Sequence, residues 1–395
     1  MQINIATRLK KLPPYLFLEL DRAKRKVKQQ GKDIIDLGIG DPDQPTPPQI
    51  INALYKAVQD PANHRYALDQ GMPELRQGIA DWYKRRFKVI LDPETEILPL
   101  IGSKEGIAHL PLAMINPGDY SLVPDPCYPP YRGGTILAGG KVYSLPLLQE
   151  NEFLPELKKI PAAILRKARL LYLNYPNNPT AAVAGMGFYQ KVVRFAEQNN
   201  IAVISDLAYS EICFDGFKAP SFLEVEGAKK VGIEFHSLSK TYNMTGWRIG
   251  WVCGNKNLVS AVAKVKSNID SGIFSAIQIA GITALKTPQA YIDKISRFYQ
   301  ERRDLLVGGL SSLGWQITKP KATFYLWGRV PCDYSKTTKQ CSSIDFVQKI
   351  LKGTGIVITP GVGFGKSGEG YVRFALTVNR QRIKEAISRL AKALR

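Results

Sequence analysis

The feature that most constrains the fold of this chain is a series of short apolar runs, separated from one another by helix-like stretches. Runs rich in β-branched residues predict buried strands, and strands that alternate with helices are typical of a parallel sheet. Helices cover both faces of such a sheet. The sequence therefore predicts an α/β fold whose sheet is mostly parallel. The apolar runs are residues 96–102, 120–124, 141–146, 168–174, 201–206, 232–237 and 248–254.

The length and a change of pattern along the chain predict two domains. The chain has 395 residues, which is more than one compact domain usually contains. From about residue 285, a long helical stretch is followed by shorter strands and helices, as in a small α+β unit. We therefore expect an N-terminal arm over residues 1–45 that contributes to a small domain, a large domain over residues 46–284, and a C-terminal small domain over residues 285–395.

The charge balance is strongly basic, with 54 lysines and arginines against 34 acidic residues and a net charge of +20 at pH 7. The basic residues are dispersed, and their densest run, Arg22 to Lys28, fits a solvated helix face. A nucleic-acid site would need interleaved aromatic residues or a known module, and the sequence has neither. We therefore expect no nucleic-acid partner. The excess charge suits an acidic small substrate or solubility alone.

The cysteine and histidine content argues against a structural metal. Five cysteines without CxxC spacing and three histidines predict reduced thiols and no zinc site. The start of the chain lacks the apolar core of a secretory signal. The longest weakly polar stretch, residues 272–285, is shorter than the roughly 20 residues of a membrane span. We expect a soluble cytoplasmic protein with no metal and no membrane partner.

The segment HSLSKTYNMTGWRIGW, residues 236–251, carries the strongest signal for chemistry. A predicted strand ends at Ser237, Ser239 and Lys240 follow it, and Arg248 stands eight positions beyond the lysine. A lysine amine suits a Schiff base with an aldehyde, while hydroxyls and a guanidinium suit a phosphate on the same ligand. Taken alone, a surface lysine in a polar loop explains the pattern equally well.

A carboxylate and a phenol end another predicted strand. Asp206 closes the run IAVISD, and Tyr209 follows three positions later. A pyridoxal ring needs a carboxylate beside its ring nitrogen, because the ion pair keeps that nitrogen protonated and the ring electron-withdrawing. Tyr209 would then donate to the phenolic oxygen of the ring. The alternative for Asp206 is an ordinary helix N-cap.

Three further positions fit the same ligand. The motif GSKEG places Ser103 and Lys104 at a helix start, where free backbone amides form a phosphate cradle. Asn178 lies in a proline-punctuated loop after a strand, and Tyr128 is a ring that could stack on a flat ligand. The alternatives are a capped helix start, an Asn-Pro turn and a core aromatic residue.

Taken in order, these motifs resemble the class I/II aminotransferases, pyridoxal-phosphate enzymes of fold type I. The match runs from GSKEG through Asn178, Asp206 and Lys240 to Arg373, and it covers nearly the whole chain. The resemblance implies a large domain with a mostly parallel seven-stranded sheet, a smaller α+β domain and pyridoxal 5'-phosphate as the cofactor. It also implies a homodimer whose active sites are shared between subunits.

The resemblance assigns a role to each matched position. Lys240 is expected to bond the cofactor aldehyde and then to move the substrate proton as general base and acid, while Asp206 pairs with the ring nitrogen. Tyr66, Tyr128 and Asn178 are also expected to contact the substrate. The implied phosphate ligands are Ser103, Lys104, Ser237, Ser239, Arg248 and, from a neighbouring subunit, Tyr66; the implied ring contacts are Tyr128, Asn178 and Tyr209; the implied clamp on the substrate α-carboxylate is Arg373 with the Gly40 amide.

A narrower resemblance concerns the substrate. The strings KLPPYLFLELDRAKRK and DLGIGDPDQPTPP are similar to those of LL-diaminopimelate aminotransferases, which make LL-2,6-diaminopimelate and 2-oxoglutarate from tetrahydrodipicolinate and L-glutamate in lysine biosynthesis. Asp69 is expected to bind the distal amine, and Tyr15 to enclose the substrate; a solvated turn and a packing aromatic are the alternatives. The other open functions are an aminotransferase for aspartate, alanine or aromatic amino acids, and a pyridoxal-phosphate lyase.

Overall fold

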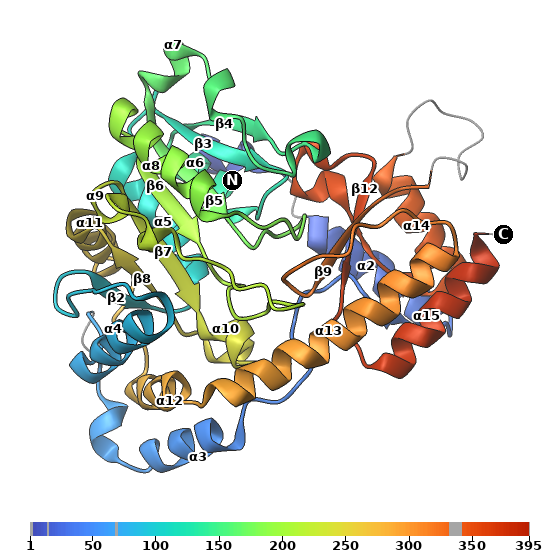
Figure 1. The fold of residues 1–395 in the computed structure, drawn as a ribbon, viewed down its shortest axis with the longest axis horizontal. Helices are drawn as coiled ribbons and strands as arrows, with labels where there is room; N and C mark the ends of the chain where they lie inside the picture. Colours follow the sequence, from blue (N-terminus) through green and yellow to red (C-terminus); the bar gives the residue numbers. More distant parts are fainter. Residues whose placement is uncertain (1–2, 14–15, 68–69, 332–341, 395) are drawn as a thin grey trace.

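The computed structural model describes residues 3–13, 16–67, 70–331 and 342–394. Its largest sheet has seven strands in the order β2-β8-β7-β6-β5-β3-β4 (Figure 1). Neighbouring strands are parallel except at β8, which is antiparallel to β2 and to β7. The predicted mostly parallel sheet is confirmed. Its strands are β2 (Ile97–Leu100), β3 (Tyr120–Asp125), β4 (Lys141–Pro146), β5 (Ala168–Asn174), β6 (Ala202–Asp206), β7 (Gly232–Ser237) and β8 (Gly250–Gly254).

The central strands contribute apolar side chains to both faces of the sheet because both faces are covered. In β5, Leu171 and Leu173 enter one hydrophobic cluster, whereas Leu170 and Tyr172 enter another. Successive side chains of a strand point to opposite faces, so one run of apolar residues supplies two cores. This explains why β5 is apolar on both of its faces.

Helices fill both faces of the sheet. The face that includes Leu170 carries α5, α6 and α11, and the face that includes Leu171 carries α3, α4, α8 and α12. The longer helices are α3 (Pro48–Ala57), α4 (Pro73–Phe87), α5 (Ser103–Met114), α6 (Pro130–Leu137), α8 (Met186–Asn199), α11 (Lys256–Lys266) and α12 (Ser275–Leu285), and the short ones are α1 (Thr7–Lys10), α7 (Ala162–Leu165), α9 (Ala228–Val231) and α10 (Leu238–Thr241). Among the described residues, no helix has both the length and the apolar character needed to span a membrane.

The connection between β7 and β8 is the short segment of residues 238–249. It contains only the four-residue helix α10 and a 3-10 turn at Thr245–Trp247. The chain therefore turns back at the carboxyl end of β7 and enters β8 in the antiparallel direction. As a result, residues 238–249 stay at this end of the sheet, and they include Lys240 and Arg248.

A second group of elements lies beside the large sheet (Figure 1). It contains a three-stranded sheet in the order β11-β12-β9 and a parallel pair of β1 with β10. That pair joins Ile35 to Ile356, so the N-terminal segment is part of the C-terminal unit. The domain limits that the sequence suggests stay a prediction. The elements are α2 (Leu16–Gln29), β1 (Ile35–Asp36), α13 (Gln289–Ser312), β9 (Tyr325–Arg329), α14 (Ser343–Thr354), β10 (Ile356–Val357), β11 (Thr359–Pro360), β12 (Tyr371–Ala375) and α15 (Arg380–Ala393).

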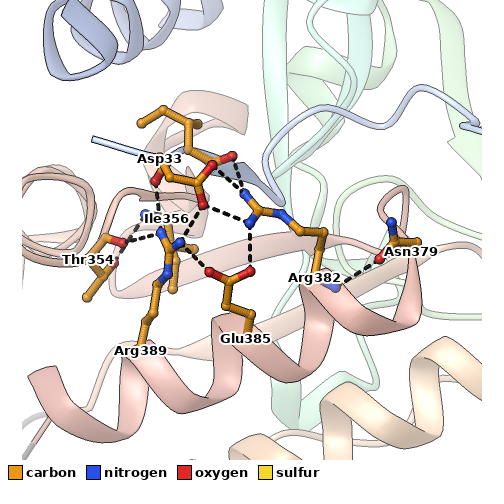
Figure 2. Close-up of polar contacts among 8 residues, drawn as sticks. Asp33, Thr354, Ile356, Asn379, Arg382, Glu385 and Arg389 are labelled. Carbon is orange, nitrogen blue, oxygen red and sulfur yellow. Dashed lines mark hydrogen bonds and ion pairs between the residues drawn. The ribbon is translucent and has the colours of Figure 1, made fainter. Parts of the chain in front are cut away.

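An ion-pair cluster ties this N-terminal segment to α15 (Figure 2). Arg382 donates to both carboxylate oxygens of Asp33, at 2.7 and 2.9 Å, and to Glu385 at 2.6 Å. Arg389 pairs with the same two acids and donates to the carbonyl oxygen of Thr354 at 3.0 Å. Asp33 is therefore joined to arginines about 350 residues further along the chain, and both arginines also pair with Glu385 on their own helix.

Candidate active site

Polar side chains gather where the parallel strands of the large sheet end. Asn174 ends β5, Asp206 ends β6 and Ser237 ends β7, while α5 begins at Ser103 just after β2. Ligand sites of open α/β sheets lie at this edge. A cavity of about 380 Å³ opens at this edge, between the sheet and the C-terminal unit.

Most of the site residues predicted from the sequence line this single cavity. They come from strand ends, from the N-terminus of α5, from the β7–β8 connection and from β12, so residues more than 300 positions apart meet here. Their chemical roles stay predictions. The predicted residues that line the cavity are Gly40, Ser103, Lys104, Tyr128, Asn178, Asp206, Tyr209, Ser237, Ser239, Lys240, Arg248 and Arg373.

Three predicted residues are not in this group. Tyr66 does not line the cavity of the described chain, and its side chain is 91% exposed. Tyr15 and Asp69 lie outside the described residues. The predicted contacts of Tyr66 involve a neighbouring subunit, and a single chain leaves that prediction untested.

Lys240 has an unusual environment for a lysine. Its Nζ donates to the carbonyl oxygen of Gly40 at 3.0 Å. Burial lowers the pKa of the Lys240 amine from 10.5 to about 8. Asp41 opposes this shift, whereas Arg373 and Arg248 add to it. A larger fraction of the amine is therefore neutral near pH 7 than for an ordinary lysine, and a neutral amine is the nucleophilic and basic form.

The carboxyl group of Asp206 is buried, and only one of its two oxygens accepts a side-chain hydrogen bond. Its Oδ2 accepts a hydrogen bond from the Tyr131 hydroxyl at 2.7 Å, while its Oδ1 has no hydrogen-bond partner among the described residues. Burial raises the pKa of the Asp206 carboxyl to about 6, and the Tyr131 hydroxyl and the Ala208 amide act in the opposite direction. A buried acceptor without a partner is costly, so this oxygen marks where a ligand N–H would bind.

The N-terminus of α5 and the Arg248 guanidinium lie close together at the cavity. Ser103 and Lys104 open this helix of 12 residues and line the cavity, so the first backbone amides are directed to it. Gly102 precedes them with a φ of 75°, and a Cβ there would lie 2.2 Å from Nη2 of Arg248. A side chain here would displace the guanidinium, and the positive φ also favours glycine. Ser237 lines the same cavity.

Arg373 is buried between polar and aromatic partners. Its Nη1 donates to Oδ1 of Asn178 and its Nη2 to the carbonyl oxygen of Gly38, both at 2.7 Å. The guanidinium carbon lies 4.1 Å from the ring centroid of Tyr325 and 4.7 Å from that of Phe364. These contacts fix the plane of the guanidinium, a group that can bind a carboxylate through two parallel hydrogen bonds.

The sequence reasoning did not identify Tyr325 as a site residue. Its hydroxyl lies 3.2 Å from the Tyr209 hydroxyl, and a Cβ on Gly40 would lie 1.9 Å from it, so Gly40 leaves room for this phenol. Tyr325 begins β9, and the sequence of a strand gives no sign of which side chain meets a ligand. Asn174 was detectable, because it ends a predicted strand as Asp206 does. The other lining residues that were not predicted are Ile39, Ala208, Thr245 and Phe364.

The arrangement suits one kind of ligand. A carboxylate with an unsatisfied oxygen can pair with a protonated ring nitrogen, a partly neutral lysine can bond an aldehyde, and a helix N-terminus with an arginine can bind a phosphate. Asp206, Lys240 and Ser103 line one cavity, so one molecule can reach all three. The buried arginine supplies a separate position for the carboxylate of a second molecule.

Comparisons with known proteins agree with this chemistry. The chain matches the family model "Aminotransferase class I and II" over residues 32–390. The LL-diaminopimelate aminotransferase of Moorella thermoacetica is 52% identical over 389 residues, which cover 98% of each chain. That of Halothermothrix orenii is 54% identical over 385 residues, or 98% of this chain and 97% of the relative. The substrate-bound structure of BacF from Bacillus subtilis has a TM-score of 0.94 at 39% identity and covers 99% of this chain and 98% of that one.

Proposed function

Because this chain belongs to the class I and II aminotransferases and has their fold, we propose that it transfers the amino group of L-glutamate to tetrahydrodipicolinate. The products are LL-2,6-diaminopimelate and 2-oxoglutarate, and the reaction serves lysine biosynthesis. The observation that carries the proposal is the identity of 52–54% to enzymes named for this activity, over 98% of the chain. The strings that first suggested the substrate lie within the matched length.

The cofactor is pyridoxal 5'-phosphate. When bound, it supplies an aldehyde carbon that bonds amines and a ring that withdraws electrons from that carbon. Three observations indicate that the cavity fits it: the unsatisfied Oδ1 of Asp206, the buried amine of Lys240, and the amides of α5 beside Arg248.

We assign the cofactor contacts from chemistry. The Asp206 carboxylate would keep the ring nitrogen protonated, and Tyr128 would cover the ring. The Asn178 amide oxygen already accepts from Arg373, so its NH₂ group is the donor left for the phenolic oxygen of the ring, together with the Tyr209 hydroxyl. The phosphate ligands would be the α5 amides and the side chains of Ser103, Lys104, Ser237, Ser239 and Arg248.

Proton transfer falls to Lys240. The Nζ atom in its neutral form takes the proton that leaves the substrate Cα, and the ammonium returns a proton in the reverse direction. A pKa of about 8 places both forms within reach near neutral pH. Arg373 would hold the substrate α-carboxylate and so fix the Cα within reach of this amine.

The homodimer is also part of the proposal. Tyr66 is 91% exposed, and Tyr55 on α3 is 68% exposed. Ile269 and Phe274, which precede α12, are also exposed, and α12 packs against α3. A second copy of the chain would cover these apolar side chains and bring its Tyr66 to the neighbouring phosphate. Analytical ultracentrifugation tests the dimer, and a monomer that is fully active would contradict it. A cytoplasmic location completes the proposal.

The decisive experiment is a panel of single half-reactions on the purified holoenzyme. LL-diaminopimelate, glutamate, aspartate, alanine and phenylalanine are each mixed with the enzyme, and the loss of the visible cofactor band is followed by stopped flow. We expect the first two to react at least about 100-fold faster, as kcat/KM, than the others, because a site built for polar groups rejects molecules that lack them. Equal rates with aspartate or phenylalanine would favour the other aminotransferase functions, and β-elimination products would favour the lyase.

The sequence-based assignment of Asp69 has its own test. Asp69→Ala should raise KM for diaminopimelate far more than KM for glutamate, because only the former carries a distal amine. Glutamate is thus the internal control. Equal losses for both substrates would remove Asp69 from distal recognition while leaving the transamination proposal intact.

A further inference from the structure

The two oxygens of Asp206 are in different situations. Oδ2 accepts from the Tyr131 hydroxyl at 2.7 Å, and Oδ1 has no hydrogen-bond partner among the described residues. The carboxyl group is buried at the end of β6 and lines the cavity. A carboxylate with one oxygen fixed has lost its freedom to rotate about χ2, so the position of the other oxygen is fixed as well.

Tyr131 is itself held firmly. It lies in the first turn of α6, and its side chain is buried. Its ring stacks on the ring of Tyr172 at 4.9 Å and 14°, and it meets the Tyr128 ring edge-on at 5.8 Å. The stack fixes the plane of the phenol, and its hydroxyl donates to Oδ2 of Asp206.

A packing role alone does not require the hydroxyl. A phenylalanine would fill the same space and keep the stack. The neighbouring Tyr172 shows the contrast, because its hydroxyl is also buried but has no hydrogen-bond partner among the described residues. Of the two stacked phenols, only that of Tyr131 meets a carboxylate, and a hydrogen bond to a charged acceptor is about twice as strong as a neutral one.

We propose that Tyr131 is a positioning residue: its hydroxyl binds Oδ2 of Asp206, keeps the carboxylate ionised and orients Oδ1 for the ring nitrogen of the cofactor. This inference rests on the proposed function, because it takes the ligand of Asp206 to be pyridoxal phosphate. Tyr209, beyond the end of β6, is a titratable group that interacts with this carboxyl, and Lys240 and Arg373 line the same cavity. The hydrogen bond from Tyr131 also acts to lower the pKa of the Asp206 carboxyl, against the effect of burial.

The first test is the affinity of the apoprotein for pyridoxal phosphate, measured by equilibrium titration. Tyr131→Phe should weaken this affinity roughly 10- to 100-fold, because a hydrogen bond to a charged group is lost. The matched control, Tyr172→Phe, removes a buried hydroxyl from the same stack and should change the affinity by less than about threefold. Equal affinities of the two variants would overturn the inference.

Asp206→Asn separates this inference from the proposed function. If Asp206→Asn leaves the affinity unchanged, Asp206 does not bind the cofactor, and the proposed site itself fails. If Asp206→Asn weakens binding but Tyr131→Phe behaves as Tyr172→Phe does, only the positioning role fails. If both the proposed site and the positioning role are correct, Tyr131→Phe should weaken cofactor affinity less in the Asp206→Asn background than in the wild-type protein. The reason is that the two residues act as one unit.

The second test needs no cofactor. Carbon-13 NMR of aspartate-labelled apoprotein follows the Asp206 carboxyl through a pH titration, with Asp206→Asn to assign the signal. Its midpoint should move upward in Tyr131→Phe and stay in place in Tyr172→Phe. A 3-fluorotyrosine at position 131 keeps the ring and is a stronger donor, so it should move the midpoint downward. If the midpoint of the Asp206 carboxyl moves neither in Tyr131→Phe nor with 3-fluorotyrosine, the inference is overturned. The two changes are independent, so the fluorinated protein still provides the test if Tyr131→Phe folds poorly.

Discussion

Two groups of charged side chains in this molecule show opposite acid–base behaviour. In the cluster of Figure 2, Arg382 and Arg389 hydrogen-bond to Asp33 and lower the pKa of its carboxyl, and Arg389 does the same for Glu385. In the cavity, burial raises the pKa of Asp206 to about 6 and lowers that of Lys240 to about 8. Partners stabilise the charged forms in the cluster, and the lack of water disfavours them in the cavity.

The difference shows what each region is built for. Every charge of the cluster has an opposite charge within reach, so the cluster is complete as it stands. In contrast, the charged forms of Asp206 and Lys240 are fully stabilised only when a ligand binds in the cavity. A buried group without its partner lowers stability, and such groups persist where function requires them. Four changes test this contrast, from the largest expected effect to the smallest.

Replacing the buried amine should have the largest effect. Lys240→Ala should lower transamination by at least about a thousandfold and abolish the visible band of the bound cofactor, because it removes both the covalent bond and the proton carrier. Absorbance spectroscopy and steady-state kinetics measure both. Lys264→Ala, on the exposed side of α11, is the control and should change neither. An unchanged spectrum in Lys240→Ala would remove this lysine from the mechanism.

The same substitution can be made in both regions. Arg373→Lys keeps the charge but loses the planar fork, so KM for every α-amino acid should rise roughly 10- to 100-fold. Arg382→Lys breaks the bidentate pair with Asp33 and should leave KM unchanged. If the two variants had equal KM values, Arg373 would not bind the α-carboxylate.

The pH dependence of cofactor uptake should report the lowered pKa of Lys240. Only the neutral amine attacks an aldehyde, so the bimolecular rate of uptake by apoprotein should rise about tenfold per pH unit below the pKa and level off above about 8. Stopped-flow absorbance gives this profile. A rate that still rises at pH 10 would mean that burial does not perturb this lysine.

The smallest effect is expected in the cluster. Asp33→Asn should lower the melting temperature by at most about 2 °C, because exposed ion pairs contribute little. The lowered pKa of Asp33 means that its stabilisation is present above 3.8, its ordinary value, and is lost as the pH falls through the folded-state pKa. The difference between wild type and variant should therefore vanish in acid and shrink in high salt. A large loss at neutral pH would make the cluster more than a surface pairing.

Much of the fold followed from local pattern. The apolar runs that predicted the central strands correspond to β2 to β8. The antiparallel direction of β8 was not predictable from its apolar pattern, because a buried strand has the same composition in either direction. It arises from the short connection that holds Lys240 and Arg248 at one end of the sheet.

The candidate site, like the fold, was predictable from the sequence only in part. The sequence by itself determined which reactive groups are available, because lysine, aspartate and arginine at strand ends or beside them are local features, and their order along the chain indicated the family. Only the tertiary structure decided which groups are satisfied: that Tyr131 binds one oxygen of Asp206 and that Tyr325 lies against Arg373. Those contacts depend on strand order and side-chain packing between distant segments, and no local pattern encodes them.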